Sequence, residues 1–341
     1  MNDGLTYRDA GVNLEAARAT KARISRLVQG TRTDAVSSDF GSFGGRFRAT
    51  PGRELVASAD GVGTKLKIAF MADRHDTVGA DLVNHCVNDI LVEGARPLIF
   101  MDYVACGVLD PDTVTSVVSG LAAACRANGC ALLGGETAEM PDFYAPGEYD
   151  LAGFVVGEIT YPELSRRDLE PGDRLIGLAS SGIHTNGYSF VRALFFDRLG
   201  LGAHDAFPGA DGSVSDVLLR PHRSYLPILE RSLEAGRVRA LAHITGGGIP
   251  GNVDRVIGSN LDAVVRTDCW PRPHEFDVIA RESGAEEAEL FSTFNMGVGM
   301  VAVVREGEAG RVLDEIRGAG CEAFMCGELV AGSGRVHLEG S

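Results

Sequence analysis

Apolar and polar positions alternate in blocks along the chain, and these blocks predict strands and helices in turn. In the first half the pattern predicts a strand at Leu55 and Val56, followed by a helix, a strand, a helix and two strands at 79–95, 97–104, 111–128, 130–133 and 151–159. Asp110 as N-cap, Pro111 at the first helical position and Gly129 beyond the end delimit the second helix. This alternation indicates an α/β layer architecture.

The second half repeats this pattern after a polar stretch that ends in a Glu-Pro-Gly-Asp turn near residue 172. It predicts strands at 174–179, 240–244 and 299–304 and helices at 187–199, 221–235, 250–257 and 308–317. Segments 125–136 and 316–328 share the order helix, glycine, strand and Gly-Glu, which reflects either two related halves or chance. We therefore expect an α/β (α+β) protein with an N-terminal segment 1–50, a first domain 51–168 and a C-terminal α/β domain 169–341.

Charge and composition argue against several classes of protein. The chain has 32 Lys and Arg against 47 Asp and Glu, a formal net charge of −15, so we expect neither a nucleic-acid nor a membrane partner. The N-terminus has no signal-peptide pattern and no stretch has 18 consecutive apolar residues, which predicts a cytoplasmic protein. Seven cysteines without C-x-x-C spacing predict buried, reduced thiols. The Gly-rich segment 39–47 has no regular period, so we expect a mobile loop there.

A first candidate site follows the first strand, in the sequence Asp60-Gly-Val-Gly-Thr-Lys65. The glycines let backbone amides approach an anion, Asp60 can hold a divalent cation, and Lys65 can neutralise phosphate. The segment matches neither a Walker A motif nor a dinucleotide-binding G-x-G-x-x-G. A simple Asp-Gly turn between two strands is the alternative.

The predicted helix at 79–95 has a polar face of unusual composition. Within an arc of about 140° it carries only Asp, Asn and His, and apolar residues fill the remainder. These polar residues are Asp81, Asn84, His85, Asn88 and Asp89. Solvated faces usually carry Lys, Glu and Arg, which are better helix formers. The face therefore indicates a metal-facing or ligand-facing surface, with an ordinary exposed face as the alternative.

Further glycine-rich turns follow later strands. Gly134-Gly135-Glu136-Thr137 lies at the carboxyl end of a strand, where open α/β sheets bind ligands, so Glu136 could meet Asp60 and Asp89 around Mg²⁺. In the second half, segments 180–189, 242–252 and 293–300 offer free amides, hydroxyls and amide side chains that suit a sugar or phosphate. His184 and His243 are either general acids or bases, or merely hydrogen-bonded.

Six segments, in order over nearly the whole chain, together resemble the phosphoribosylformylglycinamidine cyclo-ligase family, also called aminoimidazole ribonucleotide synthetases, of purine biosynthesis. The segments are 60–65, 87–90, 134–141, 180–189, 245–248 and 294–300. The resemblance implies a homodimer whose N-terminal domains pair through a shared β-barrel, with ATP near that interface. It also implies that ATP and formylglycinamidine ribonucleotide give ADP, phosphate and aminoimidazole ribonucleotide.

The resemblance also implies roles for individual residues, and a lid over the nucleotide formed by the glycine segment before the first strand. Acids at the positions of Asp60, Asp89 and Glu136 look like the Mg²⁺–phosphate ligands. We expect ATP binding by Asp60, Gly61, Gly63, Thr64, Lys65, Asn88, Asp89, Gly134, Gly135, Glu136 and Thr137. We expect substrate binding by Ser181, His184, Thr185, Asn186, Thr245, Gly246, Gly247 and Asn295, and catalytic roles for Lys65, His184 and His243.

Two departures from the family pattern limit these assignments. Segment 41–46 differs from the usual Gly-Gly-Phe-Gly-Ala run, which puts the lid's details in doubt. Gly251 precedes Asn252 where relatives often carry an acid, so no role is assigned there. The alternatives are another ATP-dependent superfamily member, such as a small-molecule kinase or a selenophosphate synthetase, and a catalytically silent nucleotide-binding scaffold.

Overall fold

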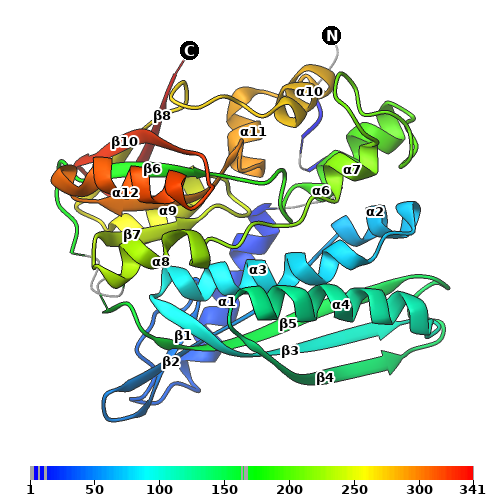
Figure 1. The fold of residues 1–341 in the computed structure, drawn as a ribbon, viewed down its shortest axis with the longest axis horizontal. Helices are drawn as coiled ribbons and strands as arrows, with labels where there is room; N and C mark the ends of the chain where they lie inside the picture. The colour runs from blue at the N-terminus through cyan, green and yellow to red at the C-terminus, as the bar shows by residue number, and fades with distance from the viewer. Residues whose placement is uncertain (1–3, 7, 11–13, 163, 165–167, 341) are drawn as a thin grey trace.

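Two mixed sheets organise the protein in the computed structural model, which describes residues 4–6, 8–10, 14–162, 164 and 168–340. The first is a five-stranded sheet in the order β1-β2-β5-β3-β4, and the second is a six-stranded sheet in the order β11-β8-β10-β6-β9-β7. Helix α3 lies between the two, above the first sheet and below the second (Figure 1). The chain is thus a two-domain mixed α/β protein, as the sequence pattern predicts.

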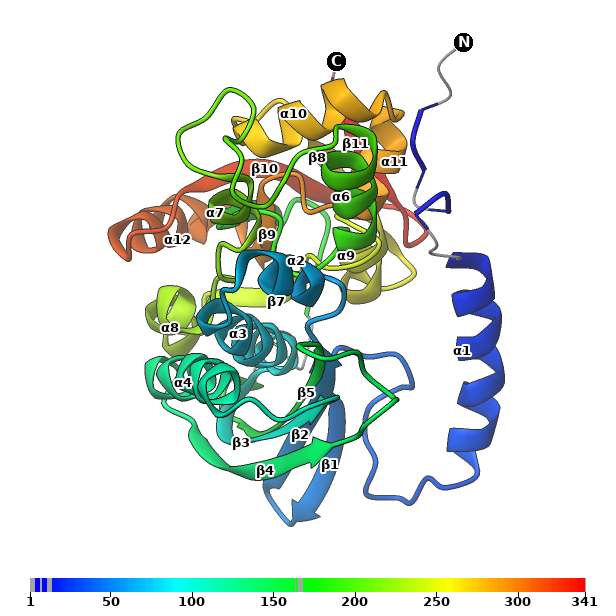
Figure 2. The ribbon, with the colours of Figure 1, turned by 90° about the vertical axis from the view of Figure 1, so that its right-hand side faces the viewer.

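The first half contains α1 (Leu14–Gln29), β1 (Gly45–Thr50), β2 (Arg53–Gly61), α2 (Lys65–Ala72), α3 (Asp76–Val92), β3 (Ala95–Cys106), α4 (Pro111–Ala127), β4 (Ala131–Glu139) and β5 (Tyr149–Ile159). Strands β3 and β4 are parallel and joined through α4, whereas the other pairs are antiparallel. Helices α3 and α4 cover the same face of this sheet (Figure 2). The predicted caps of α4 are confirmed, since Asp110 accepts from the amides of Asp112 and Thr113.

The second half contains β6 (Arg174–Ala179), α6 (Tyr188–Arg192), the π-helical turn η1 (Ala193–Arg198), α7 (Val214–Leu218), α8 (Leu226–Glu234), β7 (Val238–His243), α9 (Pro250–Ile257), β8 (Leu261–Arg266), α10 (His274–Ser283), α11 (Glu287–Thr293), β9 (Val298–Val304), α12 (Glu306–Gly318), β10 (Ala323–Ala331) and β11 (Val336–Glu339). Strand β9, between β6 and β7, is buried along its whole length. Helix α12 packs on β6, β9 and β10, while α9 packs on β7, β8 and β11.

Several elements differ from the sequence-based expectation. Helices α1, α2, α10 and α11 and strands β8 and β11 were not predicted. The helix expected at 221–235 begins only at Leu226, because the backbone of 222–225 is hydrogen-bonded to side chains of α3 instead of to its own turn. The expected domain boundary near 168 lies partly in residues outside the described ones and stays a prediction.

Close contact between α3 and α4 depends on two glycines. A Cβ atom on Gly120 would lie 2.2 Å from the backbone oxygen of Asp76, and one on Gly79 would lie 2.3 Å from that of Val117. Real Cβ atoms do not approach oxygen so closely, so any larger residue forces the helices apart. This contact fixes how α3 lies across the sheet, and α3 carries much of the candidate site.

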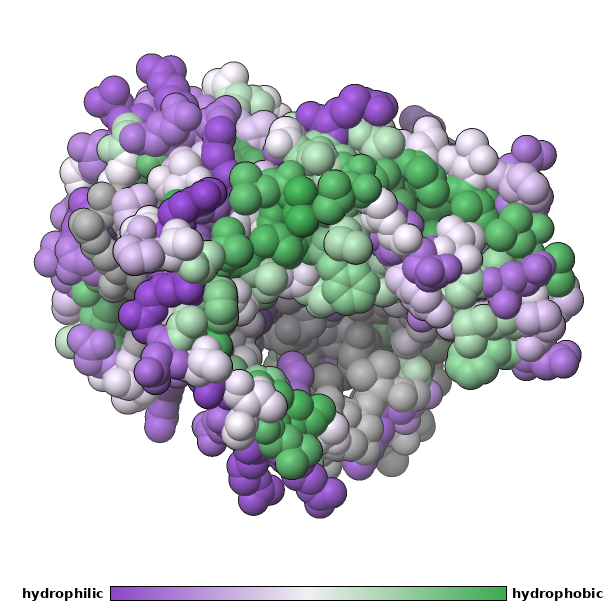
Figure 3. Space-filling view, turned by 90° about the horizontal axis from the view of Figure 1, so that it is seen from below, coloured by the Kyte–Doolittle hydropathy of each residue, from purple (hydrophilic) through white to green (hydrophobic). Residues whose placement is uncertain are grey.

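Among the residues that the structure describes, no helix covers the opposite face of the five-stranded sheet. Its strands alternate, so that Phe100 and Val155 are buried beneath α3, whereas Met101 and Phe154 point outward with 43% and 48% of their surface exposed. Figure 3 shows apolar side chains gathered on the face seen from below, where this sheet lies. Within the described residues the sheet is open, and a closed barrel is not formed by this chain alone.

Two further expectations concern cysteines and membranes. All seven cysteines are free and all but Cys269 are buried, which confirms buried, reduced thiols for six of them. Among the described residues, we find no helix with the length and apolar character needed to cross a membrane.

Candidate functional site

The polar face of α3 contacts the second domain and not open solvent. Asn84 donates to the carbonyl of His222 (2.7 Å), and Asn88 both donates to the carbonyl of Arg223 (2.8 Å) and accepts from the amide of Tyr225 (2.9 Å). The expected ligand-facing surface is therefore largely an interface between domains. Asn88, predicted to bind the nucleotide, uses its side-chain amide for this contact.

Lys65 is completely buried at the same interface. Its ammonium donates to Asp81 Oδ1 (2.8 Å) and to the backbone carbonyls of His184 (3.0 Å) and Arg220 (2.8 Å). Burial lowers the pKa of Lys65 and raises that of Asp81, and their mutual attraction opposes both shifts. The structure thus gives the Lys65 ammonium three protein partners, and its predicted phosphate contact stays a prediction.

Four histidines gather around Asp60 and Asp89, and three of them belong to one chain of hydrogen bonds. His85 Nε2 lies 3.0 Å from Asp60, and His85 Nδ1 lies 2.7 Å from Thr185 Oγ1. Thr185 Oγ1 lies 3.4 Å from His222 Nδ1, and His222 Nε2 lies 2.9 Å from His243 Nε2. His243 Nδ1 completes the chain at Asp89 Oδ1, 2.7 Å away. This series of hydrogen bonds runs from the first domain to the second and back to the first.

The number of protons in this chain limits the possible directions of its hydrogen bonds. Each of the five bonds needs one proton, yet His85, Thr185, His222 and His243 in their neutral forms supply only one each. With both carboxylates ionised, one histidine must therefore be cationic. His85 is the best placed, because it lies between Asp60 and Asp89. His85 then donates to Thr185, Thr185 to His222, His222 to His243, and His243 to Asp89.

The pKa shifts agree with this assignment. Burial alone would lower the pKa of His85, but its hydrogen bond to Asp60 and the charges of Asp60 and Asp89 raise it to about 9. Burial lowers the pKa of His243, and the Asp89 hydrogen bond only partly opposes it. Burial and neighbouring histidines hold the pKa of His222 well below its usual range. His222 and His243 are therefore neutral. With both ring nitrogens of His243 engaged, its predicted catalytic role stays a prediction.

The structure brings Asp60 and Asp89 together but leaves Glu136 apart. Across the sheet, Asp60 is in register with Gly153, Asp102 and Gly135, whereas Glu136 is in register with Tyr103, Ala152 and Gly61. Directly opposed residues share a face, so Asp60 and Glu136 point to opposite faces, with their strands about 14 Å apart. Thr137 lies on the same face of the sheet as Asp60. Gly134 and Gly135 are exposed on the edge strand β4. Convergence of the three acids within one chain is not observed.

Two buried asparagines shape the glycine-rich turns of the second domain. Asn252 donates to the carbonyls of Thr245, Gly246 and Gly248, and it is completely buried. Asn295, expected to bind substrate, donates to the carbonyls of Gly182 and Ile183, and its substrate contact stays a prediction. A Cβ atom on Gly246 would lie 3.2 Å from Asn186 Oδ1, so these two predicted substrate-binding residues are neighbours. Their binding roles stay predictions.

His184 has hydrogen-bonding capacity that the protein does not use. It adopts a left-handed backbone conformation (φ 67°), its Nε2 accepts from the amide of Ser181, and its ring stacks on His222 at 3.9 Å. Burial, together with neighbouring cations, holds its pKa well below the usual range, so the ring is neutral and carries its proton on Nδ1. Among the described residues, this buried Nδ1 has no hydrogen-bond partner. The predicted contact of His184 with the substrate stays a prediction.

The Gly-rich segment 39–47 lies against both domains. Phe43 is 7% exposed, its carbonyl accepts from Ser58 Oγ, and the guanidinium of Arg255 lies 3.5 Å from the centre of its ring. Arg255 also donates to the carbonyl of Gly41. Strand β1 begins at Gly45, within the segment expected to be irregular. Nearby, Thr64 meets Ser189 across the domains (3.2 Å). The segment's expected mobility without nucleotide stays a prediction.

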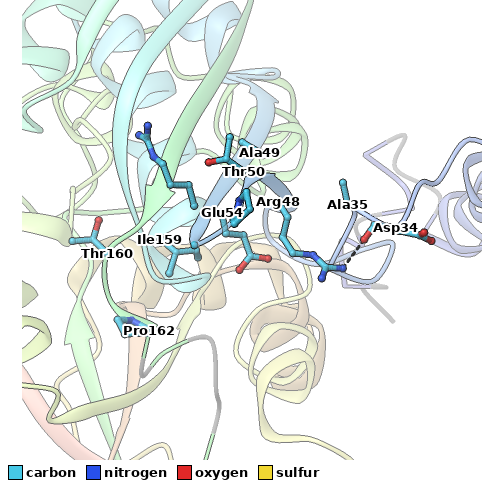
Figure 4. A pocket seen from close by; sticks show the side chains of 12 residues that line it. Asp34, Ala35, Arg48, Ala49, Thr50, Glu54, Ile159, Thr160 and Pro162 are labelled. Atoms are coloured by element: carbon cyan, nitrogen blue, oxygen red, sulfur yellow. Dashed lines mark hydrogen bonds between the residues drawn. The ribbon is translucent and has the colours of Figure 1, made fainter.

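A cavity of about 860 Å³ lies elsewhere, beside the β1–β2 hairpin. Figure 4 shows Arg48, Glu54 and Thr160 among the side chains around it. None of the predicted site residues lines it. The candidate site therefore rests on the convergence of side chains at the domain interface.

His222 is the residue of this site that sequence reasoning missed. It stands in a polar stretch, Arg220-Pro-His-Arg-Ser-Tyr225, without any glycine turn or motif. Only the docking of this stretch onto α3 brings its ring to His243 and Thr185.

The fold and this interface define a class of two-domain proteins in which a small mixed sheet pairs with a larger α/β domain. The structure is similar over 92% of this chain to hydrogenase maturation protein HypE in complex with ATP (86% of that chain, TM-score 0.64, 20% identity). It is also similar over 92% to a thiamine-monophosphate kinase from Stenotrophomonas maltophilia (94% of that chain, TM-score 0.64, 19% identity). At these identities the likeness shows the shared fold.

Sequence relatives define the family more narrowly. Residues 34–159 match the N-terminal domain, and residues 170–339 the C-terminal domain, of AIR synthase related proteins, and the chain belongs to this family. It is 47% identical to the phosphoribosylformylglycinamidine cyclo-ligase of Geobacter metallireducens, covering 96% of this chain and 95% of the relative. It is 45% identical to that of Alkaliphilus metalliredigens, covering 98% of each. The family expected from the six segments is thus confirmed.

Proposed function

We propose that this chain is an ATP-dependent cyclo-ligase that converts formylglycinamidine ribonucleotide to aminoimidazole ribonucleotide in cytoplasmic purine biosynthesis. The observation that carries the proposal is identity of 45–47% to cyclo-ligases over nearly the whole length of both chains. All six motif segments lie within this match. The buried carboxylate of Asp89 also argues against a silent scaffold, because an unneeded buried carboxylate is costly to keep.

The chemistry requires activation of a poor leaving group. Transfer of the γ-phosphoryl group of ATP to the formyl oxygen turns that oxygen into phosphate, and an amidine nitrogen then attacks the formyl carbon and expels it. The protein's part is to position the reactants and to stabilise charge during phosphoryl transfer. We assign the phosphate end to Asp60 and Asp89, and the ribonucleotide to the turns of the second domain. We also assign contact with the ribonucleotide to His184, whose buried Nδ1–H has no hydrogen-bond partner among the described residues.

Magnesium fits the two acids that the structure brings together. Mg²⁺ prefers oxygen ligands and is commonly held by one or two carboxylates together with phosphate oxygens. Asp60 is 36% exposed, and Asp89 has one oxygen, Oδ2, outside the hydrogen bond to His243. When bound there, Mg²⁺ would neutralise charge on the phosphate groups of ATP. The histidine nitrogens nearby are already hydrogen-bonded, which disfavours a histidine-rich metal site.

The direct test is incubation of the purified protein with ATP, Mg²⁺ and formylglycinamidine ribonucleotide. We expect stoichiometric ADP, phosphate and the cyclised amine. Asp60→Asn should lower turnover strongly, whereas Asp314→Asn, which changes an exposed carboxylate on α12, should not. Release of phosphate without the cyclised product, or phosphorylation of a different small acceptor, would favour the kinase-type alternative.

We also propose that two copies pair through the uncovered face of the five-stranded sheet. Met101 and Phe154 are directly opposed on β3 and β5, and β4 adds Leu133, which is 63% exposed. A monomer rarely leaves such a continuous apolar surface in water. Glu136 lies on this face, so pairing would bring its carboxylate into the interface region.

Sedimentation equilibrium should therefore give the mass of a dimer. Phe154→Glu should shift the protein toward the monomer, whereas Phe143→Glu, at an exposed loop position outside the sheet, should leave the dimer intact. A wild-type protein that stays monomeric at micromolar concentration would refute the pairing.

A further inference from the structure

Arg255, on α9, holds the Gly-rich segment 39–47 against the second domain. Its guanidinium lies over the Phe43 ring, 3.5 Å from the ring centre, and its Nη2 donates to the carbonyl of Gly41 (2.8 Å). Phe43 is only 7% exposed, whereas Arg255 lies at the surface. This contact can therefore break and form again without unfolding of α9.

The same guanidinium is joined to the glycine turn 245–248 through the buried side chain of Asn252. Its Nη1 donates to Asn252 Oδ1 (3.2 Å). The Nδ2 of Asn252 donates to three backbone carbonyls of the turn, at Thr245, Gly246 and Gly248. The amide of Asn252 thus has its oxygen toward Arg255 and its nitrogen toward the turn. Among the described residues, the backbone amides of Gly246 and Gly247 have no hydrogen-bond partner, so a ligand can bind them.

We propose that Arg255 is a positioning residue that couples the order of segment 39–47 to the order of the turn 245–248. A ligand bound to the free amides of the turn fixes the turn's carbonyls against Asn252. The oxygen of Asn252 is then held toward Arg255, and Arg255 in turn holds Phe43 and Gly41. Segment 39–47 therefore becomes less mobile when the turn is occupied, without direct contact between the ligand and the segment. Couplings between two sites typically change an equilibrium by about 5- to 150-fold.

The shape of the guanidinium explains why an arginine makes this link. Its flat face covers the Phe43 ring, while two different nitrogens at its edge donate to Gly41 and to Asn252. A lysine ammonium is a compact charge without a planar face, so it cannot make all three contacts at once. Arg255→Lys therefore keeps the charge but breaks the link.

The first test needs no ligand and uses hydrogen exchange of the full chain, followed by mass spectrometry. Arg255→Ala should speed exchange by about fivefold in peptides from both 39–47 and 245–252, the size expected for loss of a stacked cation and a hydrogen bond. Arg255→Lys should restore slow exchange in at most one of the two. Arg311→Ala is the control, because Arg311 is an exposed arginine on α12 that pairs with Glu315, and it should change neither peptide.

The second test adds formylglycinamidine ribonucleotide alone, and its choice rests on the proposed function, which assigns this compound to the turns of the second domain. At a saturating concentration, established by calorimetry, it should slow proteolysis within 39–47 by about fivefold or more in the wild type and in Arg311→Ala. In Arg255→Ala, saturating ribonucleotide should leave the cleavage rate unchanged. If the wild type does not bind the ribonucleotide, the proposed function fails, and hydrogen exchange still decides the coupling.

Three results would overturn the coupling. If Arg255→Ala speeds exchange in 39–47 but not in 245–252, Arg255 only anchors the segment. If Arg255→Lys exchanges like the wild type in both peptides, the charge suffices and the link through two nitrogens is wrong. If bound ribonucleotide protects 39–47 equally in the wild type and in Arg255→Ala, the segment senses the ligand by another route.

A second variant covers the case in which Arg255→Ala does not fold. Phe43→Leu removes the stacked ring but keeps an apolar side chain at this buried position. Faster exchange in 245–252 of folded Phe43→Leu would support the coupling, because Phe43 reaches that turn through Arg255. Unchanged exchange there would refute it.

Discussion

Replacing Lys65 with methionine tests whether its buried ion pair supports the docking of the two domains. Methionine keeps an unbranched stem of similar length but removes the donor to Asp81 and to two carbonyls of the second domain. The Asp81 carboxylate, which is completely buried, would keep only the amide of His222 as a partner. Breaking a buried pair in this way costs about 3–5 kcal/mol.

Urea and thermal unfolding measure this loss. With about 2–4 °C per kcal/mol for a protein of moderate size, Tm should fall by about 10 °C. Lys67→Met is the matched control, because Lys67 is 40% exposed and pairs with Glu148 at the surface, where such pairs contribute about 0–1 kcal/mol. Adding Asp81→Asn to Lys65→Met should recover part of the stability, since it removes the uncompensated charge but keeps an acceptor for the His222 amide.

The opposite result would refute this reasoning. If Lys65→Met unfolds at the wild-type Tm but loses turnover, the ammonium acts on a ligand and not on the protein. The double variant provides a second criterion. If it is no more stable than Lys65→Met, an unpaired Asp81 is not the cause of the loss.

Three further predictions concern packing, pH and the glycine segment. Gly120→Ala should lower the free energy of unfolding in urea by about 1–3 kcal/mol, because the added Cβ meets α3. Gly310→Ala, whose Cβ lies in open space on α12, should raise it by about 0.4–1 kcal/mol. Equal effects of the two substitutions would disprove the close helix contact. Folding raises the pKa of His85 from 6.5 to about 9. Protonated His85 therefore stabilises the folded state fully below pH 6.5, and this contribution is lost as the pH rises through 9. In chelator-treated wild-type protein the free energy of unfolding should fall between pH 6.5 and pH 9, and it should fall less in His85→Gln. Identical pH profiles of the two proteins would contradict the raised pKa of His85. Proteolysis within 39–47 should be slowed by ATP and Mg²⁺ and accelerated by Arg255→Ala, which removes the contact with Phe43; rates insensitive to both would argue against a lid.

Local signals in the sequence determined much of this protein. The caps of α4 act within one turn of the helix, so Asp110 and Gly129 could be interpreted without any tertiary contact. Alternating apolar positions likewise predicted the central strands, and the motif segments identified the family. These features depend on residues that are close together in the sequence, so they can be predicted from the sequence alone.

Tertiary structure decided which of the motif residues meet. Asp60 and Glu136 each lie next to glycines in segments predicted at the end of a strand, but strand order and register place them on opposite faces of the sheet. The polar face of α3 suggested a ligand, yet most of it binds the backbone of 222–225, a stretch more than 130 residues away in sequence. His222 joins the site for the same reason. Its position depends on how two domains pack, and no local pattern of residues encodes that packing.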